Sequence, residues 1–183
     1  MDEYHNLDTI EEYLSSLSSS SSIGTTSEGR SIYAYEKSHN AEKTIGVGCG
    51  FAARDWASIS TCLEIIQRLE EGLWGDSINW LVLPLTNPDG YKYTWDNDRQ
   101  WEKNRAQTSI PLCRGVDISR NFPHNSWDSN EESNACSNNY PGAVAGSEAE
   151  TQAIIEFLES NSVDAFITGT IKLSNKVRIF SML

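Results

Sequence analysis

Apolar side chains recur at helical spacing in three parts of the chain. The first set is spaced three or four residues apart, at Leu7, Ile10, Leu14 and Leu17. This spacing predicts an amphipathic helix over residues 7–18, and the same spacing predicts helices over residues 56–69 and 147–159. Ser147 lies three residues before Glu150, so we expect a capping box at the start of the last helix.

The sequence between these helices predicts four strands. Residues 30–38 alternate between apolar and polar positions, as a half-buried strand does. Residues 43–50, 79–87 and 163–170 are mostly apolar, as strands buried in a parallel sheet are. Strands that alternate with helices in this way predict an α/β domain with a largely parallel central sheet.

The remaining segments predict loops. The serine-rich residues 15–22 have low complexity and predict a flexible loop, and the sequence NPDG at residues 87–90 predicts a turn. Residues 91–142 are mostly polar and aromatic, and ordered loops of this length usually form the walls or lids of a functional site. The strand and helix pattern ends at Thr170, and residues 171–183 could form a basic strand, a tail or a translated piece of an unrelated reading frame.

Composition and charge exclude several classes of protein. The chain has 183 residues, a net charge of −12 and an isoelectric point near 4.6. Nucleic-acid binding needs clustered Lys and Arg, so we expect no nucleic-acid partner. No apolar run is long enough to span a bilayer, and the acidic start MDEYHNLDTIEEY does not have the pattern of a signal peptide.

The four cysteines are Cys49, Cys62, Cys113 and Cys136. An even number without a CxxC spacing favours two disulfides over a zinc site, and four free thiols in a cytosolic chain are the alternative.

Several motifs in a fixed order suggest a family. They are YHNLDTIEEYL, SEGRSIY, GCGFAARDW, LPLTNPDGYKYTW, DRQWEKNR, GVDISRNF, SEAETQAIIEFL and AFITGT. With these motifs the chain resembles the zinc carboxypeptidases of the pancreatic A and B type, and the B branch most closely. The resemblance implies a three-layer α/β/α domain with a mixed, mostly parallel sheet over residues 3–171, lacking the family's C-terminal strands and helices. Residues 172–183 are expected to form a divergent tail.

The resemblance also implies how the cysteines pair. Cys49 and Cys62 match a disulfide of the B-type enzymes, and Cys113 and Cys136 match one shared by the A and B types. Two disulfides favour an oxidising compartment, so we expect a secreted protein, although this chain carries no signal peptide.

The family's zinc ligands are two histidines and a glutamate, and the resemblance places them at substituted positions. Ala52 and Thr170 stand where the histidines are expected, and Asp55 stands where the glutamate is expected. A hydrolytic zinc needs three protein ligands and one open position. The resemblance implies zinc as the cofactor of the family. Because the ligand positions are substituted, we expect no cofactor for this chain.

The three histidines of the chain are not expected to replace the lost ligands. They are His5, His39 and His124, and each lies in a polar segment where a structural or solvated role is the simpler interpretation.

Glu102 stands where the family has the arginine that stabilises the oxyanion, within the sequence RQWEKNR. Losing one such donor typically lowers the rate by about 100- to 1000-fold, and a carboxylate would repel the oxyanion. The alternative is that Glu102 is an exposed loop residue without consequence.

The resemblance leaves part of the substrate-binding side in place. Arg54, Arg99 and Arg120 match family arginines that line the cleft, and Ser119 replaces an asparagine that pairs with the last of them. An arginine can hold a peptide's terminal carboxylate by two parallel hydrogen bonds. The alternative is that these arginines serve only as structural ion-pair partners in an acidic protein.

Three functions remain open at this point. The first is an inactive carboxypeptidase homologue that weakly binds peptide or protein C-termini. The second is an active zinc carboxypeptidase of which this chain is an incomplete sequence, and the third is a truncated fragment without function.

Overall fold

The computed structural model describes residues 4–74, 76–123, 133–169 and 178–180. The helices in these residues are α1 (Leu7–Ser16), α2 (Trp56–Glu70), α3 (Pro88–Asp96), α4 (Ile118–Asn121) and α5 (Ala149–Ser160). The strands are β1 (Ser20–Thr25), β2 (Ser31–Lys37), β3 (Thr44–Gly48), β4 (Asn79–Leu83), β5 (Ala165–Thr168) and β6 (Arg178–Phe180).

The described strands form one mixed sheet in the order β1-β2-β4-β3-β5-β6. The three central strands, β4, β3 and β5, run parallel, and the flanking strands pair antiparallel. β6 lies within the predicted tail and pairs with β5. The domain boundary at residue 171 stays a prediction.

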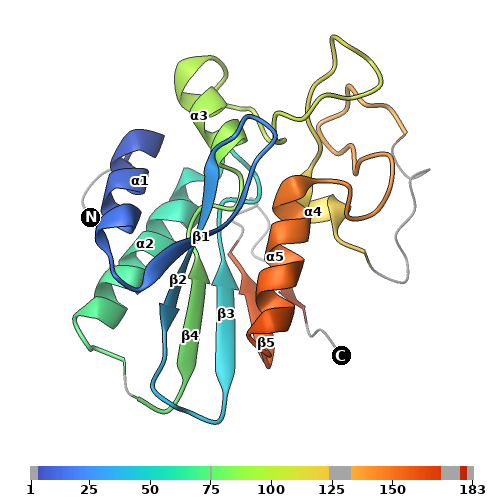
Figure 1. The fold of residues 1–183 in the computed structure, drawn as a ribbon. Helices are drawn as coiled ribbons and strands as arrows, with labels where there is room; N and C mark the ends of the chain where they lie inside the picture. The colour runs from blue at the N-terminus through green and yellow to red at the C-terminus, as the bar shows by residue number, and fades with distance from the viewer. Residues whose placement is uncertain (1–3, 75, 124–132, 170–177, 181–183) are drawn as a thin grey trace.

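Helices cover both faces of the sheet, as Figure 1 shows, with α1 and α2 on one side and α5 on the other. The strands supply alternate residues to the two sides. Tyr35 and Val82 are buried with α1 and α2, whereas Ala34 and Leu81 are buried with α5. The prediction of an α/β domain is therefore confirmed.

The serine-rich segment is not the flexible loop that its composition predicted. Residues 20–25 form β1, which pairs antiparallel with β2. α5 packs closely over this strand, and a Cβ on Gly24 would lie 2.6 Å from the Cβ of Ala153. Backbone pairing and this close approach fix the segment as a strand although serine has little preference for one.

Two helix starts also differ from the prediction. The NPDG sequence begins α3 instead of forming an isolated turn, because the buried side chain of Asn87 accepts a hydrogen bond from the backbone N–H of Gly90 at 3.0 Å. Proline at the next position is compatible with a first helical turn. The expected capping box is wrong, since Glu148 is the N-cap of α5 and the hydroxyl of Ser147 donates to Glu148 Oε1.

Both expected disulfides are confirmed. Cys49 pairs with Cys62, which joins the end of β3 to α2, and Cys113 pairs with Cys136 within the long irregular region. Among the helices in the described residues, none is long and apolar enough to cross a membrane.

Candidate functional site

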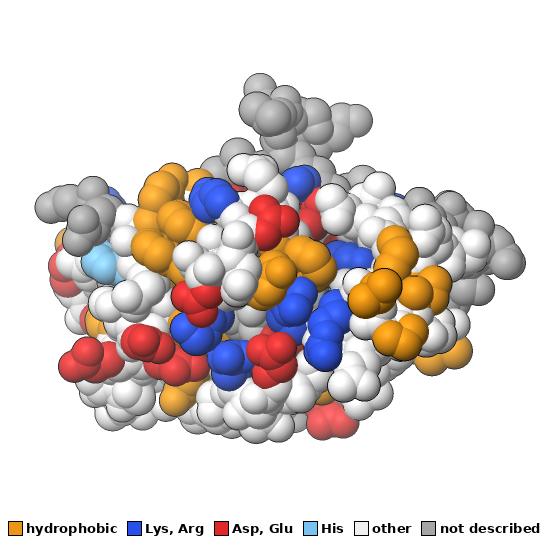
Figure 2. All heavy atoms as spheres, turned by 90° about the horizontal axis from the view of Figure 1, so that it is seen from above, with side chains coloured by type: hydrophobic (Ala, Val, Ile, Leu, Met, Phe, Trp, Pro, Cys, Tyr) orange, Lys and Arg blue, Asp and Glu red, His pale blue; other side chains and the backbone are white. Residues whose placement is uncertain are grey.

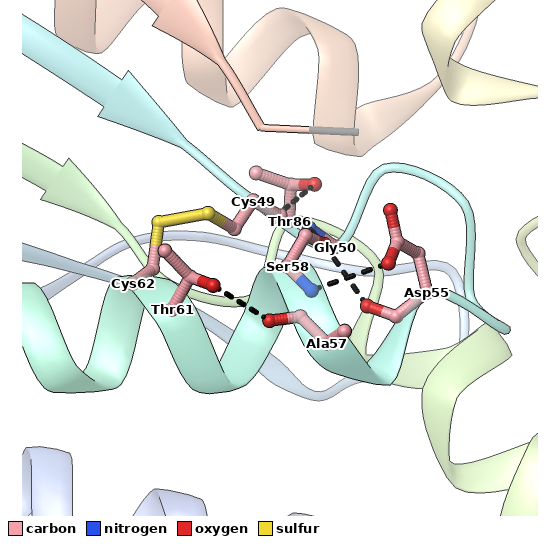
Figure 3. The surroundings of a disulfide bond; sticks show 8 residues. All are labelled: Cys49, Gly50, Asp55, Ala57, Ser58, Thr61, Cys62 and Thr86. Atoms are coloured by element: carbon pink, nitrogen blue, oxygen red, sulfur yellow. Dashed lines mark hydrogen bonds between the residues drawn. A yellow bond between two sulfur atoms is a disulfide. The ribbon is translucent and has the colours of Figure 1, made fainter. Parts of the chain in front are cut away.

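The loop between β3 and α2 carries the first two positions of the expected metal site. Gly50 has φ +71°, and a Cβ there would lie 2.9 Å from a side-chain carbon of α2, so the turn requires glycine. Figure 3 shows how the loop is held: the backbone N–H of Gly50 donates to Ser58 Oγ at 3.2 Å. The Thr86 hydroxyl, which follows β4, donates to the carbonyl of Cys49 at 2.9 Å.

Asp55 is the N-cap of α2. Its carboxylate accepts a hydrogen bond from the backbone N–H of Ser58 at 3.2 Å, as Figure 3 shows, and the Ser58 hydroxyl donates to the Asp55 carbonyl at 2.9 Å. The carboxylate therefore satisfies a donor that the first turn of a helix leaves unpaired. This is a structural role that the sequence did not predict for Asp55.

At the expected metal site, the described side chains do not supply the three protein ligands of a hydrolytic zinc ion. Ala52 presents a buried methyl group, which has no lone pair to donate. Asp55 Oδ1 caps α2, and Thr170 lies outside the described residues. Elsewhere in the described residues, no three His, Cys, Asp or Glu side chains are placed together as metal ligands.

Two of the three histidines, His5 and His39, lie in the described residues. The backbone carbonyl of His5 accepts a hydrogen bond from the Tyr91 hydroxyl at 2.5 Å. His39 lies with its Nδ1 3.1 Å from Asp76 Oδ1. His124 lies outside the described residues.

Glu102 is buried and not the exposed loop residue of the alternative interpretation. Its Oε2 lies 2.8 Å from Nη2 of Arg54, and its backbone carbonyl accepts from the N–H of Ala53 at 2.9 Å. An ion pair and a backbone hydrogen bond therefore connect the loop after β3 with the segment after α3. The structure thus pairs two residues that the resemblance assigned to different roles, substrate binding and oxyanion stabilisation.

Arg99 lies against an aromatic cluster. Its guanidinium carbon lies 3.8 Å from the ring centroid of Trp56, and its Nη1 donates to the carbonyl of Arg54 at 2.8 Å. Trp56 stacks in turn on Trp95, with ring centroids 4.3 Å apart and planes 7° apart. Arginine on the face of an indole gains cation–π attraction, which holds the side chain in one orientation.

Ser119 and Arg120 lie on α4, where both side chains contact the N-cap residue Asp117. The Ser119 hydroxyl donates to Asp117 Oδ1 at 2.6 Å, and Arg120 Nε lies 3.2 Å from Asp117 Oδ2. The rings of Phe51 and Phe122 meet edge to face with centroids 5.9 Å apart, which places the end of α4 beside the loop after β3.

Seen from the end of the molecule where α3 lies, Lys and Arg side chains gather with acidic side chains among them (Figure 2). Among the arginines predicted to bind substrate, Arg54 and Arg120 each contact a carboxylate, of Glu102 and Asp117 respectively.

Sequence analysis missed a buried polar cluster formed by Asn104, Glu148 and Glu150. The side-chain N–H₂ of Asn104 donates to Glu148 Oε2 at 2.7 Å and to Glu150 Oε2 at 3.2 Å. Burial raises the pKa of Glu150 to about 7. The sequence spacing could have predicted that Glu150 is buried. Glu150 precedes Ile154 and Phe157 by four and seven residues, and so lies on the same apolar face of α5.

The described side chains of this site include guanidinium groups that suit carboxylate binding. Guanidinium groups hold carboxylates well. Hydrolysis requires a metal ion or a general base that activates water beside the scissile carbonyl. Ala52 supplies no metal ligand at the position where the resemblance expects a histidine.

Comparison with known proteins places the chain among peptidases and their homologues. The profile of the zinc carboxypeptidase family matches residues 3–171. The chain is 35% identical over 192 residues to the inactive metallocarboxypeptidase ECM14 of Saccharomyces cerevisiae, which covers 93% of this chain and 44% of that protein. It is 32% identical over 188 residues to carboxypeptidase B of Bos taurus, which covers 91% of this chain and 45% of that protein.

Among solved structures, the fold is similar to bovine thrombin-activatable fibrinolysis inhibitor in complex with tick carboxypeptidase inhibitor. The TM-score is 0.83 at 29% identity, over 91% of this chain and 60% of that chain. The chain spans about half the length of the yeast and bovine relatives named above.

Proposed function

The chain belongs to the zinc carboxypeptidase family, and we propose that it is a member without peptidase activity that retains weak binding of peptide C-terminal carboxylates. The absence of peptidase activity is inferred from the side chains that the loop after β3 offers at the expected metal positions. Ala52 supplies a buried methyl group, and the carboxylate of Asp55 caps α2. Similarity to a relative named as an inactive metallocarboxypeptidase supports the same conclusion.

Glu102 adds a second, independent argument. A carboxylate at the expected oxyanion position opposes the negative charge that develops in peptide hydrolysis. Its ion pair with Arg54 also neutralises the charge of an arginine that the resemblance assigns to substrate binding. Both changes act against catalysis even if a metal ion were held by other groups.

The binding half rests on Arg54, Arg99, Ser119 and Arg120. The side chains of Arg54 and Arg120 are 39% and 40% exposed, so both arginines are partly accessible to solvent. Partners are accordingly proposed to be peptide or protein C-termini. The two disulfides support a secreted protein.

The experiment compares a short peptide that has a free C-terminal carboxylate with the same peptide amidated at its C-terminus. Isothermal titration with the purified chain is expected to give a dissociation constant about tenfold lower for the free carboxylate. Equal affinities for the two peptides would overturn the binding half.

Active zinc carboxypeptidase is the second candidate, and the similarity to bovine carboxypeptidase B favours it. It predicts release of C-terminal residues when zinc is supplied. Mass spectrometry of a peptide library incubated with the chain and zinc separates the candidates, because the inactive homologue leaves every peptide intact.

A further inference from the structure

We propose that Glu102 competes with a ligand carboxylate for Arg54, one of the arginines proposed to bind a peptide C-terminus, and so weakens the binding of that carboxylate. The inference rests on the proposed function, since it concerns the same site. It goes beyond that proposal because it assigns the control of affinity to one side chain.

The geometry of the pair supports this role. Glu102 Oε2 lies 2.8 Å from Nη2 of Arg54, and the side chain of Glu102 is 6% exposed while that of Arg54 is 39% exposed. The buried carboxylate therefore contacts an arginine whose side chain is partly exposed to solvent. The inference is that a ligand carboxylate reaches Arg54 from this exposed part.

The position of Glu102 is fixed by more than the ion pair. Its backbone carbonyl accepts from the N–H of Ala53, and two residues later the backbone N–H of Asn104 donates to the carbonyl of Val116 at 2.9 Å. The first of these backbone hydrogen bonds holds the segment that carries Glu102 beside the loop that carries Arg54.

Charge determines the consequence for binding. A ligand carboxylate at Arg54 gains attraction to the guanidinium and suffers repulsion from Glu102, which shares that guanidinium. In a partly buried site such repulsion is screened less than on an open surface. Removing the charge of Glu102 while keeping its shape is therefore expected to tighten carboxylate binding.

Three variants isolate this effect. Glu102→Gln removes one negative charge at the site and keeps a side-chain oxygen for Arg54. Glu64→Gln is the matched control, because Glu64 pairs with Arg68 at the same 2.8 Å on the exposed surface of α2 and changes the net charge equally. Arg54→Gln combined with Glu102→Gln tests whether any gain passes through Arg54, without leaving a buried charge unpaired.

Isothermal titration with the free-carboxylate peptide and its amide gives the result. Glu102→Gln is expected to bind the free carboxylate about tenfold more tightly than the unmodified chain, with Glu64→Gln unchanged and the gain lost in the double variant. Equal or weaker binding by Glu102→Gln, while the unmodified chain still prefers the free carboxylate, overturns this inference and leaves the proposed function standing. Absence of preference in both chains overturns the two together.

An NMR titration of the unmodified chain is a second test, and it does not require a variant to fold. Bound carboxylate shares the Arg54 guanidinium, so the NMR signal of the Arg54 Nε–H group is expected to shift as the peptide saturates the site. A saturated complex in which this signal does not move contradicts a role for Arg54, and with it the competition by Glu102.

Discussion

Arg54 Nη2 lies 2.8 Å from Glu102 Oε2, and this contact joins two loops that the sequence places 48 residues apart. The first loop carries the expected metal position and the second the expected oxyanion position. The protein thus places an ion pair between its own side chains where the resemblance expects groups that act on a substrate.

Restoring an arginine at position 102 is expected to destabilise the fold. Glu102→Arg places a second guanidinium beside Arg54 in a buried position, and breaking such a pair leaves like charges without compensation. We expect a loss of about 2 kcal/mol in the free energy of unfolding, because Arg54 is partly exposed and the full cost of a buried pair is not reached. Urea unfolding monitored by circular dichroism measures it.

The exchanged pair is the control for this prediction. Arg54→Glu combined with Glu102→Arg restores opposite charges and is expected to recover part of the lost stability. Unchanged stability in Glu102→Arg alone would show that the ion pair contributes nothing.

Asp55 is expected to act as a helix cap. Asp55→Ala removes the acceptor for the Ser58 N–H and should cost about 1 kcal/mol, whereas Asp55→Asn keeps an oxygen acceptor and should cost a few tenths. Thermal unfolding in the presence and absence of a chelator measures both. A melting temperature that falls on chelation in the unmodified chain, and no longer does so in Asp55→Asn, would instead identify Asp55 as a metal ligand.

Stability is expected to depend on pH through Glu150. The pKa of its buried carboxyl is raised from 4.5 to about 7 in the folded protein, mainly by burial. Between these values the folded state binds more protons than the unfolded state, so the free energy of unfolding falls as pH rises through this window. The full contribution is present below about pH 4.5, and its loss by pH 7.5 is on the order of 3 kcal/mol.

Glu150→Gln, which stays neutral at every pH, is the variant that tests this dependence. The difference in unfolding free energy between pH 4.5 and pH 7.5 should be smaller in the variant than in the unmodified chain, because other titrating groups contribute equally to both. Identical differences would mean that the Glu150 carboxyl ionises in the folded state as it does in water.

The two disulfides should differ in their accessibility to reductants. Cys49 and Cys62 are both buried, whereas Cys136 is exposed. Thiol–disulfide exchange requires attack on an accessible sulfur, so mild reduction of the native chain should open the Cys113–Cys136 bond first. Alkylation followed by peptide mass spectrometry identifies the reduced pair. Earlier modification of Cys49 and Cys62 would contradict the described burial.

Periodicity was sufficient for most of the fold because the strands and helices bury regular faces. The apolar residues of β3 and β4 and the helical spacing in α2 are direct consequences of burial on the sheet. β1 was missed because its serines carry no apolar pattern, and its pairing with β2 is a tertiary effect.

The candidate site could be predicted only in part, for a similar reason. The resemblance located Arg54 and Glu102 individually, but their contact depends on how two distant loops fold together. The helix cap made by Asp55 was not predicted, because the resemblance already explained this residue as a substituted metal ligand. The Asn104 cluster was missed since an acidic residue at a helix start looks like a cap, whether or not it is buried.

The most direct test of the inactive-homologue account is native mass spectrometry of the non-reduced chain with zinc supplied. The account predicts a narrow, low charge-state distribution, a mass four hydrogens below that of the reduced chain because of the two disulfides, and no stoichiometric zinc. A folded chain with one bound zinc ion would contradict it, and the active carboxypeptidase would then be the better explanation.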